Sequence, residues 1–236
     1  LGDTNSSLGA IIAKRMGVKV YHMEAGNRCF SNKSPEEVNR KIIDHSSDIL
    51  LPYTTGSAKN LIDEGIQKKN IIITGNPIYE VILYNKNKID KSNILKTFNE
   101  KKNNYFVITL HREENTDDLN KLKSFIDIFN KIASNYNKKL YWPIHPRSLK
   151  NIKKIKIKIN KNLKLIKPLG FFDFIKLEKN SKFVFTDSGT VQEECAIFKI
   201  PCFIIREYTE RLETIKAGSG ILVDNKKDKI LKLLER

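Results

Sequence analysis

Three acidic residues near the start of the chain stand where apolar or helical segments begin or end. Asp3 lies at the first turn, Glu24 comes soon after the predicted strand of residues 18–21, and Glu36 opens the next helical stretch. A carboxylate at the end of a buried strand is usually there for chemistry, because burying a charge without a partner is costly. The three acids would suit proton transfer if they converge on one cleft.

Two histidines hold similar positions in the second half of the chain. His111 follows the apolar run of residues 105–110, and His145 follows that of residues 140–144. Imidazole titrates near neutral pH, so either side chain can carry a proton, although a histidine at a strand end can also be purely structural. If both runs are strands of one parallel sheet, both imidazoles lie at its carboxyl edge, where open α/β sheets bind ligands.

A turn rich in small residues joins a predicted strand to a predicted helix at residues 187–190. Backbone N–H groups at the start of a helix form an anion site, and Gly189 lets a phosphate approach the backbone closely. Ser188 and Thr190 can donate hydroxyls, and Glu194, one turn into the helix, can accept hydroxyls from a ribose. A helix N-cap without any ligand uses the same residue types, so both interpretations stand.

Arg211 ends a loop of charged and hydroxyl residues that starts at residue 206. Its planar guanidinium would suit a diphosphate, whose oxygens it can bind in a bidentate manner. The alternative is a solvated loop held by surface ion pairs. The sequence has no Cys/His set at metal-ligand spacing, no phosphate-binding loop ending in Gly-Lys-Ser/Thr and no Gly-x-Gly-x-x-Gly fingerprint, so we predict no metal site.

Composition narrows the class of protein. The chain has 236 residues, with 43 Lys and Arg against 27 Asp and Glu, a net charge of +16. Such an excess can indicate nucleic-acid binding. Lys, Asn and Ile are overused throughout, however, as in residues 152–159, and no basic motif studded with aromatic residues accompanies the charge. We therefore predict no nucleic-acid partner.

The cysteine count and the lengths of the apolar segments bear on cellular location and on membrane association. Cys29, Cys195 and Cys202 are an odd number without paired spacing, which favours reduced thiols and a cytoplasmic location. The apolar runs have the length of strands and are far too short to span a membrane, so we predict no membrane partner.

Short apolar runs alternate with amphipathic helical stretches, which is typical of α/β folds with parallel sheets. Strands are predicted at residues 18–21, 49–51, 71–74, 105–110, 140–144, 163–166, 183–186 and 202–205, and helices at 7–16, 36–48, 117–136 and 191–198. In the first helix Leu8, Ile11 and Ile12 should face inward, and Ser57 should cap a later helix.

The chain should divide into two lobes. Residues 83–104 lose apolar periodicity, and we expect a linker there between a lobe at residues 1–88 and a lobe at residues 89–236. The chain opens with Leu1 in what reads as the middle of a strand-to-turn motif. We therefore expect the first lobe to be incomplete, with an N-terminal portion missing.

Six motifs follow one another along the chain. They are Gly2-Asp3-Thr4, His22-Met23-Glu24-Ala25-Gly26, Pro35-Glu36-Glu37-Val38-Asn39-Arg40, His111-Arg112-Glu113-Glu114-Asn115, Asp187-Ser188-Gly189-Thr190 and Thr209-Glu210-Arg211. Together they resemble the non-hydrolysing UDP-N-acetylglucosamine 2-epimerase family. The resemblance implies two Rossmann-like lobes facing a cleft, the glycosyltransferase-B-like architecture. It also implies inversion at C2 of a UDP-2-acetamido sugar without a cofactor, by elimination and re-addition of UDP, in a homodimer.

The resemblance implies roles for individual residues as well. The positions that match catalytic or sugar-contacting residues are Asp3, Glu24, Glu36 and His111. Those that match UDP contacts are Phe174 on the uracil side, Ser188, Gly189, Thr190, Glu194 and Arg211. Arg112 and His145 match residues that hold a second UDP-sugar as an activator in some members.

The substrate and the reaction stay open within this resemblance. Residues 26–30 and 168–174 resemble the subgroup that acts on modified sugars. A hydrolysing UDP-N-acetylglucosamine 2-epimerase and a nucleotide-sugar glycosyltransferase on the same scaffold are the alternatives, because a shared fold does not fix the reaction.

Overall fold

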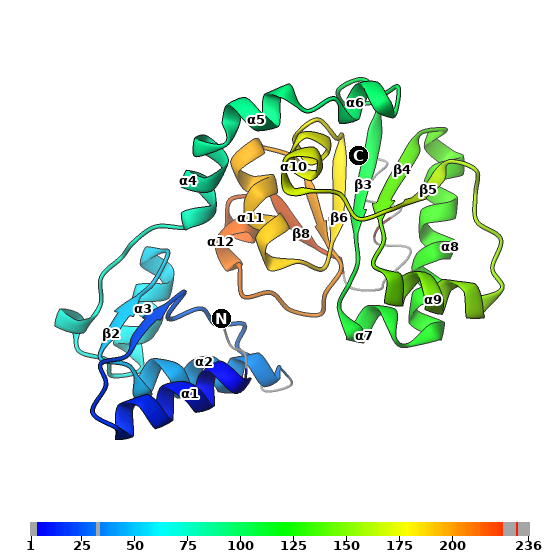
Figure 1. Ribbon diagram of the computed structural model, residues 1–236. Helices are drawn as coiled ribbons and strands as arrows, with labels where there is room; N and C mark the ends of the chain where they lie inside the picture. The colour runs from blue at the N-terminus through cyan, green and yellow to red at the C-terminus, as the bar shows by residue number, and fades with distance from the viewer. Residues whose placement is uncertain (1–3, 32–33, 224–229, 231–236) are drawn as a thin grey trace. The chain divides into compact units, whose positions relative to one another are not determined.

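The computed structural model describes residues 4–31, 34–223 and 230, which form two compact units. Unit 1 comprises Leu1–Pro77 and Tyr208–Glu213, and unit 2 comprises Ile78–Glu207 and Thr214–Arg236. Each unit combines helices with a parallel sheet (Figure 1), so the predicted α/β class is confirmed.

Unit 2 is built on a six-stranded parallel sheet. Its strands are β3 (Tyr105–Thr109), β4 (Lys139–Pro143), β5 (Leu163–Ile166), β6 (Phe183–Thr186), β7 (Cys202–Ile204) and β8 (Gly220–Leu222). They lie in the order β5-β4-β3-β6-β7-β8. The chain builds outward from β3 to β5 and then returns to the other side of β3 with β6. This is a doubly wound, Rossmann-type order with its switch point between β3 and β6.

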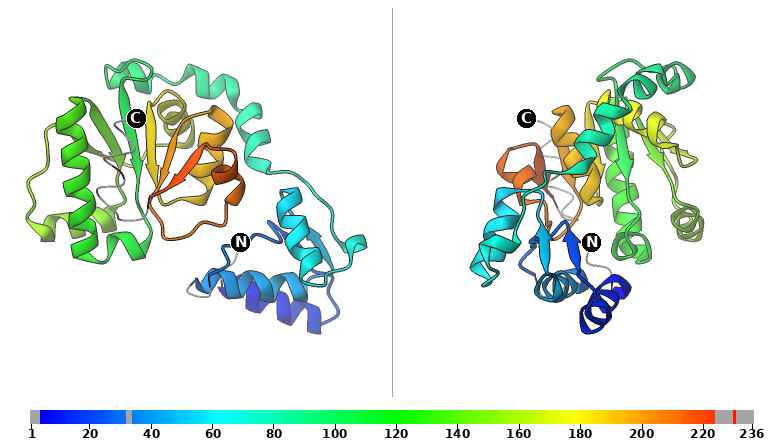
Figure 2. Two further views of the ribbon diagram at one scale, coloured as in Figure 1. Left: turned by 180° about the vertical axis from the view of Figure 1, so that it is seen from behind. Right: turned by 60° about the vertical axis from the view of Figure 1, so that its left-hand side comes forward.

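Helices cover both faces of this sheet (Figures 1 and 2). Alternate side chains of a strand point to opposite faces. Phe106 and Ile108 of β3 therefore join the core formed with α8 (Leu119–Tyr136). Tyr105 and Val107 join the core formed with α10 (Phe171–Lys179) and α11 (Gly189–Phe198). Burial on both faces explains why these strands are continuous apolar runs in the sequence.

The other helices that lie wholly or mostly in unit 2 are α4 (Pro77–Tyr84), α5 (Lys86–Lys91), α6 (Ile94–Thr97), α7 (Glu113–Thr116), α9 (Pro146–Ile155) and α12 (Leu212–Lys216). Residues 83–104, for which we predicted a linker, contain α5 and α6. Ile89 of α5 and Ile94 of α6 are buried in the cores of unit 2. Helices of this length are too short to show apolar periodicity, which is why the sequence pattern did not reveal them.

Unit 1 has a two-stranded parallel sheet, β1 (Tyr21–Met23) and β2 (Ile49–Leu51), with Tyr21 opposite Ile49. Its helices are α1 (Thr4–Arg15), α2 (Pro35–Ser46), α3 (Thr55–Asp63) and the 3-10 turn η1 (Lys68–Asn70). Ala25, Leu50 and Leu61 form its small core. The strand predicted at residues 18–21 begins only at Tyr21, and the strand predicted at residues 71–74 is a single bridge from Ile71 to Leu50.

Two predictions about the helices of unit 1 are wrong. Leu8 and Ile12, predicted to face inward, are 54% and 58% exposed. Polar contacts set the rotation of α1 instead: Ser7 is buried against α2, and Asn39 of α2 donates a hydrogen bond to the Thr4 hydroxyl at 3.0 Å.

The second error concerns the start of α3. Its N-cap is Thr54 and not Ser57, because the Thr54 hydroxyl accepts a hydrogen bond from the Ser57 backbone N–H at 3.0 Å. A cap one turn earlier satisfies an N–H group that the first turn of the helix would otherwise leave without a partner.

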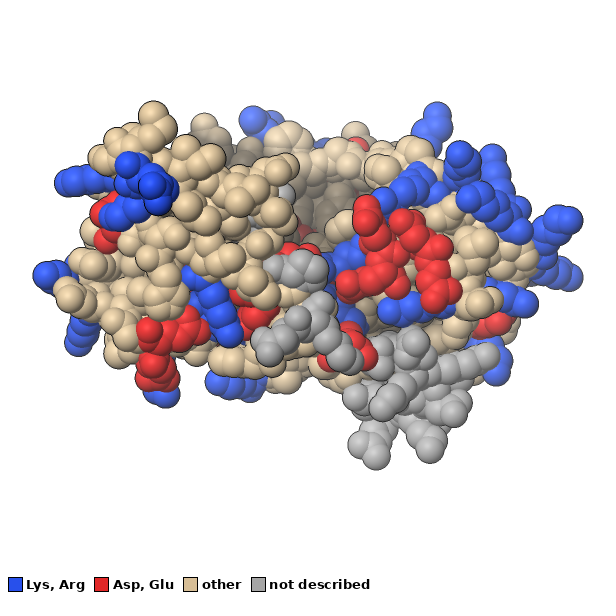
Figure 3. Space-filling model, turned by 90° about the horizontal axis from the view of Figure 1, so that it is seen from below, with Lys and Arg blue, Asp and Glu red and all other residues tan. Residues whose placement is uncertain are grey.

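The surface carries charged side chains of both signs (Figure 3). On the face shown in Figure 3, Lys and Arg side chains are spread widely, with acidic side chains among them. The positive charge on that face is therefore not gathered into one patch. Within the part of the chain that the structure describes, no helix is both long and apolar enough to cross a membrane.

Candidate functional site

Glu24 is delivered by the end of β1 in unit 1. Its backbone N–H donates to the Leu51 carbonyl of β2 at 3.1 Å, which continues the strand pairing by one residue. The backbone of Glu24 then turns into the left-handed region with φ of 63°. Non-glycine residues rarely adopt this conformation, and those that do concentrate at functional sites. The side chain is buried.

The carboxylate of Glu24 is paired with the guanidinium of Arg211. Arg211 belongs to the segment Tyr208–Glu213, which packs within unit 1. The amide of Asn27 donates a second hydrogen bond to Glu24 Oε1 at 3.3 Å, and the Ser57 hydroxyl donates to Asn27 Oδ1 at 2.8 Å. The structure therefore brings together two residues that the sequence predicted for different parts of the substrate.

Arg211 is not part of a solvated loop, which was the alternative interpretation of its sequence. The side chain is buried, and its backbone N–H donates to the Thr209 hydroxyl at 3.1 Å. The segment is also tied to α3, because the Thr54 hydroxyl donates to Glu213 Oε1 at 2.5 Å. A buried guanidinium with a charged partner is a fixed feature of unit 1 and not a surface ion pair.

The turn after Glu24 is held by Asp44 of α2, which the sequence did not single out. The Asp44 carboxylate accepts hydrogen bonds from the Gly26 N–H at 3.2 Å and from Arg28 Nη2 at 2.7 Å, and it lies 2.7 Å from His22 Nδ1. Burial opposes the charge of Arg28, but its bonds to Glu64 and Asp44 outweigh burial and raise the pKa of its guanidinium. This buried network fixes the backbone that presents Glu24.

Of the tandem acids in α2, the buried one is Glu37. Its carboxylate accepts from the backbone N–H groups of Cys29 and Phe30 at 2.9 and 3.0 Å, which makes it a structural anchor for this loop. Glu36, the acid predicted for the site, is partly exposed and accepts a hydrogen bond from the Ser34 hydroxyl at 2.7 Å. Asp3 lies outside the described residues.

In unit 2, the predicted histidines lie at the carboxyl edge of the sheet. His111 follows β3 and His145 follows β4, and these strands are parallel neighbours, so this prediction is confirmed. His145 is the N-cap of α9, and its Nδ1 accepts from the Arg147 N–H at 3.3 Å. Arg147 in turn pairs with Glu113 at 2.6 Å, which links the two strand ends.

Asp187, directly after β6, anchors the turn after β3 at the switch point. Its fully buried carboxylate accepts from the backbone N–H groups of His111 and Arg112 at 3.1 and 3.0 Å and from the Asn115 amide at 3.0 Å. His111 Nδ1 lies 3.0 Å from the same carboxylate. Burial would raise the pKa of Asp187, but these interactions outweigh burial and lower it.

Asp187 is part of the motif at residues 187–190, but the sequence pattern did not predict it as a site residue. The signal was available, because an acid at the end of β6 lies beside the end of β3 in a doubly wound sheet. Arg112, predicted for an activator, reaches the same turn: its Nε donates to the Asp187 carbonyl at 3.1 Å.

The residues predicted to bind a phosphate lie at the start of α11. Ser188 occupies the N-cap position, but its side chain makes no capping hydrogen bond to the helix. Its backbone N–H donates to the Thr186 hydroxyl at 2.9 Å. Gly189 and Thr190 follow in the first turn, where N–H groups lack partners within the helix.

The last two predicted nucleotide contacts lie deeper in unit 2. Glu194 is buried in α11, and burial raises its pKa to about 7. Phe174 is a partly buried residue of α10 that packs against the core between α10, α11 and the sheet.

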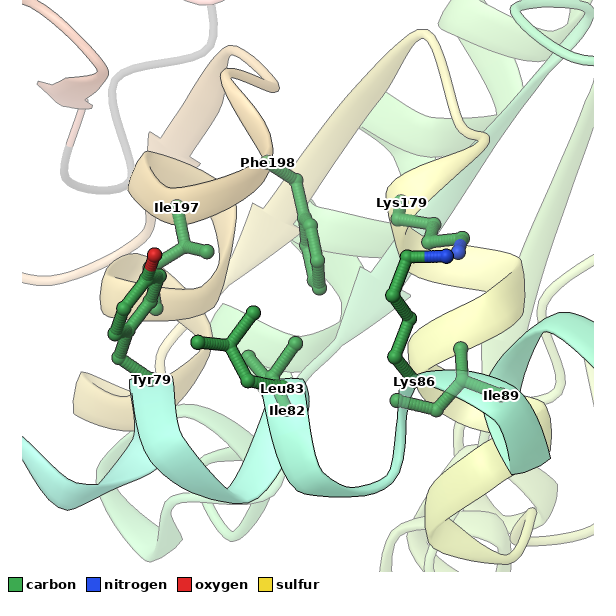
Figure 4. Close-up of a pocket in the computed structure, with 8 residues that line it drawn as sticks. All are labelled: Tyr79, Ile82, Leu83, Lys86, Ile89, Lys179, Ile197 and Phe198. Atoms are coloured by element: carbon green, nitrogen blue, oxygen red, sulfur yellow. The ribbon is translucent and has the colours of Figure 1, made fainter.

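A separate apolar pocket of about 190 Å³ lies in unit 2 (Figure 4). It is lined by Tyr79, Ile82, Leu83, Lys86, Ile89, Lys179, Ile197 and Phe198. The ammonium groups of Lys86 and Lys179 both pair with Asp90. The lining contains none of the residues predicted for the site and few polar groups to orient a nucleotide. We therefore do not assign this pocket to the candidate site.

The family model described as UDP-N-acetylglucosamine 2-epimerase matches residues 1–236 of this chain. The UDP-N-acetylglucosamine 2-epimerase of Methanocaldococcus jannaschii is 41% identical, with 99% of this chain and 66% of the relative covered. The crystal structure of the Methanocaldococcus jannaschii enzyme in complex with UDP-GlcNAc and UDP matches with a TM-score of 0.90, over 99% of this chain and 66% of that one.

A relative with a different substrate name is also similar. The UDP-2,3-diacetamido-2,3-dideoxy-D-glucuronate 2-epimerase of Pseudomonas aeruginosa is 35% identical, with 98% of this chain and 64% of the relative covered. The chain thus spans just under two-thirds of the length of these curated relatives, at 66% and 64%.

Proposed function

Because this chain belongs to the UDP-N-acetylglucosamine 2-epimerase family, we propose that it inverts the configuration at C2 of a UDP-linked 2-acetamido sugar. The reaction would interconvert UDP-N-acetylglucosamine and UDP-N-acetylmannosamine, or modified relatives of them, to supply precursors of surface polysaccharide. A base removes the C2 proton while the bond from C1 to the diphosphate oxygen breaks, which leaves a 2-acetamidoglucal and UDP. Protonation of C2 on the opposite face and re-addition of UDP at C1 complete the inversion.

The pairing of Glu24 with Arg211 carries this proposal. A general base needs a carboxylate held in one geometry, and the buried Glu24 is held by Arg211 and Asn27. A diphosphate would engage Arg211 in a bidentate manner, so Arg211 would link the base to the leaving group. The left-handed backbone at Glu24 supports a functional role for this position.

Unit 2 supplies groups suited to the leaving UDP and to proton transfer. The first turn of α11, with Ser188, Gly189 and Thr190, would stabilise the negative charge that develops on the diphosphate. His111 is exposed and held at Nδ1 by the buried Asp187, so its Nε2 can exchange a proton with a bound sugar. Phe174 and Glu194 would contact the uracil and the ribose.

Deuterium exchange at C2 tests the proposed reaction. The protein is incubated with UDP-N-acetylglucosamine in deuterated water, and the sugar is followed by NMR. Epimerisation through C2 must replace the C2 proton by deuterium and yield UDP-N-acetylmannosamine. The Glu24→Gln variant is the matched control, since it keeps the shape of the side chain but removes the base. Bound substrate with neither deuterium at C2 nor the second epimer would refute the proposal.

The same experiment separates the alternative reactions. A hydrolysing 2-epimerase would release free N-acetylmannosamine and UDP. A glycosyltransferase would leave the C2 proton in place and would transfer the sugar only when an acceptor is added.

Three further parts of the proposal concern partners and location. Arg112 and His145 would hold a second UDP-sugar as an activator at the carboxyl edge of the sheet, and a dependence of the rate on a second bound nucleotide sugar would test this. The functional protein would be a homodimer, which sedimentation would reveal. The unpaired state of Cys29, Cys195 and Cys202 is compatible with a cytoplasmic location.

A further inference from the structure

Two buried glutamates, Glu178 and Glu194, lie near each other in unit 2. Glu178 lies in the last turn of α10 and Glu194 in α11, and these helices pack against each other. Both side chains are buried, and their carboxyl groups are close enough that each affects the pKa of the other. Two adjacent carboxylates cannot both ionise at modest cost, because each charge raises the energy of the other. One of the two must therefore carry a proton.

The surroundings of Glu178 indicate that it is the glutamate that carries the proton. Its Oε1 accepts a hydrogen bond from the Cys195 thiol at 3.2 Å. Its Oε2 is completely buried and finds no hydrogen-bond partner that could donate to it among the described residues. A charged oxygen in that position would lack any donor, which is expensive in a buried site. A protonated Oε2 is itself a donor, and the neighbouring carboxylate of Glu194 can accept from it.

We propose that Glu178 is a neutral hydrogen-bond donor that orients the Glu194 carboxylate to accept the ribose hydroxyls of UDP. Glu178 is thus a positioning residue, because it acts through Glu194. This inference rests on the proposed function, which supplies the nucleotide.

The position of Glu194 along α11 fits a ribose. It lies five residues after Gly189 in the same helix, which is about 7.5 Å along the axis. If the first turn of α11 binds the diphosphate, a ribose attached to it reaches the second turn. A carboxylate oriented by one donor keeps acceptor capacity for the two hydroxyls of a ribose, whereas a deoxyribose offers only one.

The charges around the pair agree with one proton at neutral pH. Burial raises the pKa of Glu178 well above its ordinary value, and the charge of Glu194 adds to this. Burial raises the pKa of Glu194 to about 7, and the hydrogen bond from Glu178 limits that rise. Glu194 is therefore ionised above about pH 7 while Glu178 stays neutral.

Other titratable groups that affect the pair come from α11 and β7. Glu193 of α11 raises the pKa of Glu194, and Cys195 of α11 and Cys202 of β7 lie beside Glu178. The remaining charged groups of α10 are engaged elsewhere: Asp173 accepts from Ser92, and Lys176 and Lys179 donate to Asp90. Strands β6 and β8, which also pack against α11, contain no titratable side chain.

Discrimination between UDP and 2′-deoxy-UDP tests the inference by calorimetric titration of the full chain. Glu178→Gln keeps a donor that cannot ionise, and Glu178→Met keeps the length of the side chain without a donor. The measured quantity is the ratio of the affinity for UDP to the affinity for 2′-deoxy-UDP. We expect this ratio to be the same in the wild type and in Glu178→Gln. In Glu178→Met the UDP affinity should fall about tenfold or more, and the preference over 2′-deoxy-UDP should shrink. Lys176→Met, on the same helix, should leave the ratio unchanged.

The pH profile provides a second readout that a merely structural role would not move. UDP affinity of the wild type should decline as the pH falls below about 7, because Glu194 then takes up a proton. Without the hydrogen bond from Glu178 the carboxylate is less stabilised, so Glu178→Met should shift this decline to higher pH. Thermal unfolding of each variant confirms that the fold is retained.

The outcomes separate the two proposals. If the wild type binds neither nucleotide, the proposed function fails and this inference fails with it. If UDP binds but Glu178→Met keeps the wild-type ratio and pH profile, only the inference is overturned. If Glu178→Gln loses the ratio as Glu178→Met does, Glu178 does not act as a neutral donor, and the inference is again overturned.

Discussion

Replacing Asp187 by alanine tests how the switch point of unit 2 is held together. The buried carboxylate accepts from the N–H groups of His111 and Arg112 and from the Asn115 amide, at distances of 3.0 and 3.1 Å. Alanine would leave these donors without their acceptor. Removing one partner of a buried charged group costs about 3 to 5 kcal/mol. Each kcal/mol lowers the melting temperature by about 2 to 4 °C in a protein of this size, so we expect a fall of about 6 to 20 °C.

Thermal unfolding followed by circular dichroism measures this loss, with Asp117→Ala as the matched control. Asp117 is the C-cap of the neighbouring helix α7, and its side chain is 46% exposed. It accepts a long 3.4 Å hydrogen bond from Asn151 and lies 3.6 Å from Arg147. An exposed contact of this kind contributes less than about 1 kcal/mol, so the control should lose less than about 4 °C.

The loss of stability caused by Asp187→Ala should become smaller at low pH. The pKa of Asp187 is lowered in the folded protein. Its stabilisation is therefore fully present above the unfolded value of about 3.9 and is lost as the pH falls through the folded value. The difference between wild type and Asp187→Ala should narrow below pH 3.9. A loss no larger than that of the control, or one of the same size at pH 3 and pH 7, would refute the proposed anchoring role.

Three other substitutions test unit 1. Arg211→Ala should weaken UDP binding by about 1.5 to 3 kcal/mol, the range of a lost charged hydrogen bond, and unchanged affinity in calorimetric titration would contradict its assignment to the diphosphate. Glu24→Gln should abolish turnover and leave UDP binding nearly intact, and full turnover in the NMR assay would make Glu24 structural. Gly26→Ala should cost about 2 to 4 kcal/mol, because its φ is 74° and a Cβ would lie 2.2 Å from the Ser57 carbonyl oxygen. Gly65→Ala is its control in thermal unfolding, since φ is 90° there but nothing lies within 4 Å, and equal losses would discount the contact.

Five of the six strands of the sheet in unit 2 were predictable to within a residue, because burial on both faces makes each one a continuous apolar run. The sixth, β8, is three residues long and only partly buried, and it was not predicted. The strands predicted at residues 163–166 and 183–186 match β5 and β6 at both ends. In unit 1 the strands are three residues long and partly exposed, so the apolar signal in the sequence is weak. The strand predicted at residues 18–21 therefore begins three residues before β1. The rotation of α1 was not predictable from apolar spacing, since polar contacts of Ser7 and Asn39 decide it.

Some site residues could be predicted from the sequence, and others are revealed only by the structure. Glu24 and His111 stand at strand ends, where the sequence alone marks them. The buried acids that hold the turns beside them, Asp44 near Glu24 and Asp187 near His111, come from elements distant in sequence, so they are found only once strand order and helix packing are known. Glu178 is an intermediate case. It lies four residues after Phe174 and three after Ile175, so helical spacing puts it on the buried face of α10, where a glutamate is unexpected.

The corner formed by β6 and α11 shows why stability and recognition have to be measured separately in unit 2. Asp187 at its start accepts hydrogen bonds from backbone groups of another turn, so its loss should lower stability whether or not a nucleotide is present. Glu178 faces the same helix from α10 and stabilises one ionisation state of Glu194, so its loss should change the preference for a ribose more than it changes the fold. A neutral donor beside a carboxylate also costs less to bury than a second charge. The protonated glutamate is therefore the form in which Glu178 can be buried and still act on Glu194.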